Sequence, residues 1–179
     1  MAAKSNDALL RFGEKLVLVL QGLCALAGCI LIIMFIALSL ISLNMLPGLA
    51  DPSDFELLEA SPPGFLSLPI MLAGAVAALF FFFKKMRAII RSAGEGEPFI
   101  AENAQRLSTM AWLLVAVQVL GVLVSSVRLY LDNLAFGSGN NLTFSIYDLE
   151  GPLVILVLFI LARVFQHGAA MREDLEGTV

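Results

Sequence analysis

GEPFIAENAQRL, residues 96–107, is a polar stretch that lies between two long apolar runs. The chain has four apolar segments, two before this stretch at 16–43 and 66–83, and two after it at 110–131 and 152–165. A helix needs about 20 apolar residues to cross the hydrocarbon core of a membrane. The pattern predicts an all-α membrane protein, a single domain in which four transmembrane helices form a bundle.

The fourth apolar run is short, and Arg163 interrupts it. A long arginine side chain can nevertheless reach the lipid headgroups from within about one turn of the membrane boundary. We therefore expect four spanning helices at approximately 14–43, 66–90, 101–131 and 149–172.

The composition agrees with this class of protein. Hydrophobic residues make up 59% of the 179-residue chain and charged residues only 15%, whereas a soluble domain carries about 25% charged residues. The net charge of −4 argues against direct binding of nucleic acid, because phosphates are bound by clustered lysines and arginines. The bilayer is the partner that the composition predicts.

The basic residues indicate the orientation, since loops on the cytoplasmic side carry an excess of lysine and arginine. Nearly all of them fall on the side shared by the two termini and the middle connector, and Arg128 alone falls toward the other side. We expect both termini to be cytoplasmic. The residues on the shared side are Lys4, Arg11, Lys15, Lys84, Lys85, Arg87, Arg91, Arg106, Arg163 and Arg172.

Two extracytoplasmic loops are expected at 44–65 and 132–148, and together they would form a small cap. The first loop is rich in proline and cannot be one continuous helix. In the second, NLTFSIY at 141–147 alternates apolar and polar residues after a glycine-rich turn, which predicts a short β-strand.

On the cytoplasmic side we expect a connector at 84–109 and a tail at 166–179. The second helix should continue through the basic segment 84–91 and stop near Gly94, and Pro98 suits the start of the next helix. Ile100, Ala104 and Leu107 then fall on one face at helical spacing. The connector is predicted to be a helical hairpin at the membrane surface.

The connector pattern, Gly-acid-Pro-Phe-x-x-Glu-Asn-Ala-x-Arg-Leu, and the ending VFQHGAAMREDLEGTV at 164–179 resemble a bacterial family of integral membrane proteins catalogued as domain of unknown function 2975. The resemblance covers nearly the whole chain in layout. It implies a multi-pass protein of the bacterial inner membrane, with no established activity, that is a candidate membrane partner of a small helix-turn-helix regulator.

Carried onto this chain, the resemblance selects positions in two segments that are both expected on the cytoplasmic side. One interpretation is structural, with these residues forming the turn and bonding it to the tail or to headgroups. The other is a docking surface for a soluble partner, and the two interpretations are compatible. The positions are Gly96, Pro98, Phe99, Glu102, Asn103 and Arg106 in the connector, and Gly168, Arg172, Glu173, Asp174 and Leu175 in the tail.

The sequence shows no constellation that carries catalysis. It has no glycine-rich phosphate loop, and His167 is its only histidine, so that neither a metal triad nor a Ser-His-Asp set can be assembled. Cys24 and Cys29 are five residues apart, which places them on different faces of a helix. We expect no enzyme activity, no cofactor and no metal ion.

A non-enzymatic regulatory or sensory membrane protein is therefore the functional prediction. The alternatives are a small transporter or channel-like protein and a purely structural membrane protein. A transport path would typically show charged side chains near the middle of the membrane or a broken helix, whereas neutral residues such as Gln21 and Gln118 suit packing between helices. The oligomeric state is left open.

Overall fold

The computed structural model of the chain describes residues 3–45, 55–137 and 150–176, without the side chains of 3–7, 59–60 and 175–176. Each of its four long helices is long and apolar enough to cross a membrane, so the chain is a multi-pass membrane protein. The long helices are α1 (Ala3–Ser42), α3 (Pro62–Gly94), α4 (Ala101–Phe136) and α5 (Glu150–Glu176), and a short helix α2 (Glu56–Ala60) precedes α3.

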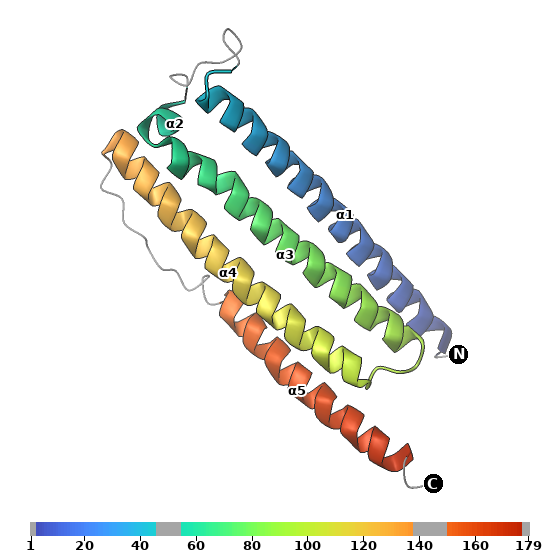
Figure 1. Cartoon of the computed structure of the whole chain (residues 1–179). Coiled ribbons are helices and arrows are strands. Elements are labelled where there is room, and N and C mark those ends of the chain that lie inside the picture. Colours follow the sequence, from blue (N-terminus) through green and yellow to red (C-terminus); the bar gives the residue numbers. More distant parts are fainter. Residues whose placement is uncertain (1–2, 46–54, 138–149, 177–179) are drawn as a thin grey trace.

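Consecutive long helices run in opposite directions and pack in chain order, α1 against α3, α3 against α4, and α4 against α5 (Figure 1). α1 and α5 therefore form the two edges of the arrangement. Both termini and the loop between α3 and α4 lie at one end, which we call the connector end. The opposite end carries α2 together with the end of α1, the start of α3 and the end of α4.

The helices extend beyond the predicted spans because hydropathy marks the apolar part of a helix and not its ends. α3 begins at Pro62 rather than near residue 66, since the missing N–H of a proline is no loss in the first turn. α4 continues to Phe136 and ends at Gly137, whose φ of +61° lies in the left-handed region that favours glycine.

The expected extracytoplasmic cap is described only in part. α2 lies within the first predicted loop, where Leu58 is 1% exposed and packs with the ends of α3 and α4. No strand occurs among the described residues, and the strand predicted at 141–147 lies outside them. What the structure shows of the cap is therefore helical.

Buried side chains gather at the two ends of the arrangement. Leu131, which is 0% exposed, lies beneath α2, and its methyl group would be 3.1 Å from a Cβ added to Gly64. At the connector end the start of α4 is buried against its neighbours. Between the ends most apolar side chains are exposed, as expected for helices whose outer faces meet lipid. The buried residues near the start of α4 are Asn103, Ala104, Leu107, Met110 and Ala111.

α5 is displaced along α4 toward the connector end (Figure 1). Gly151, at its start, lies against the side chain of Gln118, which is near the middle of the apolar run of α4. Trp112 packs edge-on against Phe159 with ring centroids 5.6 Å apart. The last turns of α5 therefore extend past Ala101, where α4 begins, and lie alongside the connector.

Candidate functional site at the connector end

The connector itself is a tight turn between α3 and α4. Gly96 has a φ of +87°, a conformation that other residues rarely adopt, and the amide of Glu97 donates to the carbonyl of Ser92 at 3.1 Å. Pro98 follows before α4 begins at Ala101. These residues set the direction in which the chain leaves α3 and enters α4.

A buried side-chain network holds this turn in place. Asn103 is 0% exposed, and its Nδ2 donates to the hydroxyl of Ser92 at 2.7 Å and to the carbonyl of Pro98 at 2.9 Å. The guanidinium of Arg106 donates to Oδ1 of Asn103 at 2.7 Å. The Ser92 hydroxyl in turn lies 2.9 Å from the carbonyl of Ile89. One amide group thus joins α3, the connector and α4.

Phe99 joins the connector to α5. Its ring lies 5.1 Å from the ring of Phe165, at an angle of 42°. The ring also stands so close to Gly168 that a Cβ added there would be 2.9 Å from Cδ1 of Phe99, closer than real Cβ atoms come. Gly168 therefore leaves the space that the ring occupies in this position.

An ion pair makes a second link between the connector and α5. Nη2 of Arg172 lies 3.1 Å from Oε1 of Glu97, although the two residues are 75 positions apart in the chain. Both side chains remain about half exposed, at 40% and 57%. An exposed pair of this kind contributes at most about 1 kcal/mol, so its main effect is to orient the two segments.

The structure thus brings together seven of the positions that the sequence selected. Glu102, Glu173 and Asp174 are instead exposed at the same end, and the side chain of Leu175 is outside the described part. Sequence reasoning did not select Ser92, Glu97 or Phe165 as site residues. Only Glu97, the acid of the quoted pattern, carried a signal. The seven positions that meet are Gly96, Pro98, Phe99, Asn103, Arg106, Gly168 and Arg172.

Other charged residues strengthen this end of the molecule. Arg87 of α3 pairs with Glu14 of α1 at 3.1 Å, and Arg91 pairs with Glu95 at 3.3 Å. The first pair links α1 to α3, and the second lies within the last turns of α3. All four long helices are therefore joined, directly or through a neighbour, around the connector.

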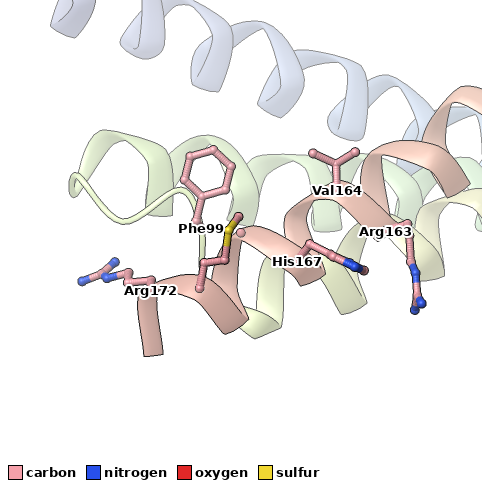
Figure 2. A pocket seen from close by; sticks show the side chains of 7 residues that line it. Phe99, Arg163, Val164, His167 and Arg172 are labelled. Atoms are coloured by element: carbon pink, nitrogen blue, oxygen red, sulfur yellow. The ribbon is translucent and has the colours of Figure 1, made fainter. Parts of the chain in front are cut away.

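A pocket of about 710 Å³ opens beside the contact of Phe99 with α5 (Figure 2). The ring of Phe99 and the side chain of Val164 lie on opposite sides of it in Figure 2, and Gly168 lines it as well. Two arginines and a histidine flank these apolar groups. The lining residues are Phe99, Arg163, Val164, His167, Gly168, Met171 and Arg172.

A scan against protein-family models, a search of curated proteins and a search of solved structures each found no match to this chain. The resemblance to the domain-of-unknown-function family stays a prediction carried by the connector and tail patterns. Within the described residues, no three His, Cys, Asp or Glu side chains are grouped so that they could hold a metal ion.

Proposed function

We propose that this chain is a non-enzymatic regulatory or sensory membrane protein whose connector end holds a small soluble regulator, of the helix-turn-helix kind that the family resemblance implies. The observation that carries the proposal is the contact of the connector with the end of α5. Arg172 pairs with Glu97, and Phe99 packs on Gly168. Two segments that are far apart in the chain thereby form one surface.

The proposal places this surface in the cytoplasm of a bacterial cell. Lys84, Lys85, Arg87 and Arg91 follow the apolar run of α3 directly, and such residues favour the cytoplasmic side of a membrane. A soluble DNA-binding protein could reach the connector end only in that orientation.

The exposed carboxylates of the connector end suit a basic partner. Exposed carboxylates lie at the start of α4 and at the end of α5. DNA-binding proteins are basic on the face that meets phosphates, and complementary charge increases the rate and the specificity of association. The connector end would therefore compete with DNA for the basic face of the regulator. The carboxylates are those of Glu102, Glu173 and Asp174. Glu95 and Glu97 are paired with Arg91 and Arg172.

A sensory mechanism follows from the way the surface is divided between helices. One part belongs to the connector and α4, and the other to α5, which packs mainly on α4. A shift of α5 along α4 would separate Arg172 from Glu97 and change the surface that the regulator meets. A stimulus in the bilayer would then alter partner binding if it favoured one position of α5 over the other.

The test uses the full chain, purified in mild detergent from its native host, with mass spectrometry of the bound proteins. We expect a small DNA-binding protein to be recovered with the unaltered chain and to be lost from the double variant Glu102→Lys, Glu173→Lys. Both positions are exposed, so the variant should still insert into the membrane. Arg106 is unsuitable for this test because its guanidinium bonds to Asn103 inside the connector.

The matched control is Glu56→Lys, a charge reversal of an exposed residue at the opposite end, which should retain the partner. A preparation that contains no soluble partner even after mild crosslinking would overturn the proposal. So would retention of the partner by the double variant at the level of the control.

A further inference from the structure

We infer that the pocket beside Phe99 is a binding site for one anionic phospholipid. This inference goes beyond the regulatory proposal and does not depend on it, because the site is formed by this chain alone. The phosphate of the lipid would lie at the cationic rim of the pocket, and an acyl chain would run along α5 toward the interior of the membrane.

The first observation is the apolar surface of the pocket. Phe99, Val164 and Met171 are 44%, 55% and 63% exposed, although all three line the same hollow. Gly168 lines the same hollow and contributes no side chain. Hydrocarbon is the kind of ligand that gains most from such a surface, because the gain is proportional to the apolar area removed from water.

The second observation is that the pocket continues an apolar stripe of α5. Leu153, Val157 and Ile160 are 60%, 59% and 56% exposed, and with Val164 they follow one another at intervals of three or four residues. Residues at this spacing share one face of a helix. Gly168 and Met171 extend the same series into the pocket. An acyl chain lying on this stripe would therefore lead directly into the hollow.

The third observation is the charge at the rim. Arg163 and Arg172 flank the pocket at its two ends, with His167 between them (Figure 2), and Arg172 is also paired with Glu97. Within the described residues, the hydrogen-bond partner of the Arg163 guanidinium is the neutral side chain of Gln166, at 3.1 Å. Its positive charge is thus available to a phosphate, and arginine binds phosphate oxygens through paired N–H groups.

The depth of the pocket agrees with this ligand. Lys84 and Lys85 directly follow the apolar run of α3, so they mark the edge of the hydrocarbon layer. In the antiparallel pair of α3 and α4, Ser92 lies against Asn103 and Gly74 lies against Leu120. Lys84 and Lys85 are therefore nearly level with Met110 of α4. On α5 that level corresponds to about Ile160, because Trp112 faces Phe159. At about 1.5 Å per residue, Arg163 lies roughly 5 Å further out, where the headgroup layer begins.

The orientation of the lipid follows from these levels. The apolar stripe 153–164 points toward the hydrocarbon, and the rim from Arg163 to Arg172 lies outside it. A phospholipid would therefore bind with its head outward, as it lies in the bilayer itself. A neutral phospholipid could fill the apolar part equally well, but its cationic headgroup would lie near the arginines.

The test is photocrosslinking of the purified full-length chain in phosphatidylcholine vesicles that contain a minor fraction of phosphatidylglycerol with a diazirine in one acyl chain. We expect crosslinks to concentrate on the segment 160–171. Arg163→Gln with Arg172→Gln should reduce them about thirtyfold, in line with about 1 kcal/mol for each of the two cations near an anionic lipid surface. Val164→Trp, which fills the apolar part of the pocket, should reduce them as well.

The matched control removes two cations at the same end but outside the pocket, as Lys84→Gln with Lys85→Gln, and should leave the crosslinks on 160–171 unchanged. Added inorganic phosphate should not displace the lipid, because the acyl chain contributes to binding. Equal loss in the lysine and arginine variants would show diffuse attraction to the membrane and overturn the inference. Equal labelling by a phosphatidylcholine probe, or displacement by inorganic phosphate, would overturn it too.

Discussion

Asn103 joins three parts of the connector end, because its single amide group bonds to α3, to the connector and to Arg106. Its Nδ2 and Oδ1 lie 2.7 to 2.9 Å from these partners in a site that water does not reach. A buried polar group that loses its partner costs about 1–3 kcal/mol. The docking interpretation of this position is therefore less direct than the structural one.

Asn103→Ala is expected to lower the thermal unfolding midpoint of the detergent-solubilised chain by several degrees, since it leaves Ser92 and the carbonyl of Pro98 without their shared donor. The control is Gln105→Ala, two residues further along α4, where the side chain is exposed. Equal midpoints for the two variants would show that the network does not stabilise the connector.

Gly168 supports a second prediction at this scale. A leucine in its place would collide with the ring of Phe99 and separate the connector from α5. We expect Gly168→Leu to increase amide hydrogen exchange in residues 97–101 and in the last turns of α5, because local opening becomes easier. Gly121→Leu is the control, since nothing lies within 4 Å of a Cβ added at that position. Unchanged exchange in Gly168→Leu would contradict the close approach.

The sequence could indicate that residues 95–98 form a turn, because Gly96 and Pro98 act through the local backbone. It could not indicate that Ser92 meets Asn103, or that Phe99 reaches Gly168. Both contacts depend on the relative positions of two helices along their axes, and an apolar run specifies helix length without specifying that position. Glu97 was visible as the acid of the connector pattern and Arg172 as a selected position of the tail, but the pairing of the two was not predictable.

At the scale of the elements, the four long helices were predictable and the position of α5 was not. Hydropathy and helix length led to the expectation of a span at about 149–172, and α5 runs from Glu150 to Glu176. Its start nevertheless lies beside Gln118 rather than near the end of α4. The contact of Gly151 with Gln118 shows how the displaced helix packs, since glycine leaves room for the amide side chain.

Cysteine crosslinking can measure this displacement in a chain with Cys24→Ala and Cys29→Ala. The pair Trp112→Cys, Phe159→Cys should be crosslinked by a short bifunctional thiol reagent, because the two native rings are in contact. If α5 instead began level with Leu131, Ala169 would lie beside Trp112, and the pair Trp112→Cys, Ala169→Cys would crosslink. Preferential crosslinking of the second pair would contradict the position of α5 described above.

At the scale of the whole molecule, the helices form an open row in which α1 and α5 occupy the edges (Figure 1). Few side chains are buried in the middle of the row, and the connections at its two ends hold it together. The regulatory proposal and the lipid site both depend on the connector end, where the last turns of α5 lie against the loop between α3 and α4.

The most direct measurement is therefore crosslinking of Glu97→Cys with Arg172→Cys by a short bifunctional thiol reagent in isolated native membranes, with Cys24 and Cys29 replaced by alanine. The tips of the native side chains are 3.1 Å apart. Because the reagent replaces the length that both side chains lose on substitution by cysteine, we expect the pair to crosslink nearly completely. The pair Glu14→Cys, Arg172→Cys, which joins the two edges of the row, should not crosslink. If Glu97→Cys with Arg172→Cys crosslinks no better than that control, the connector and α5 do not form one surface and the account is wrong.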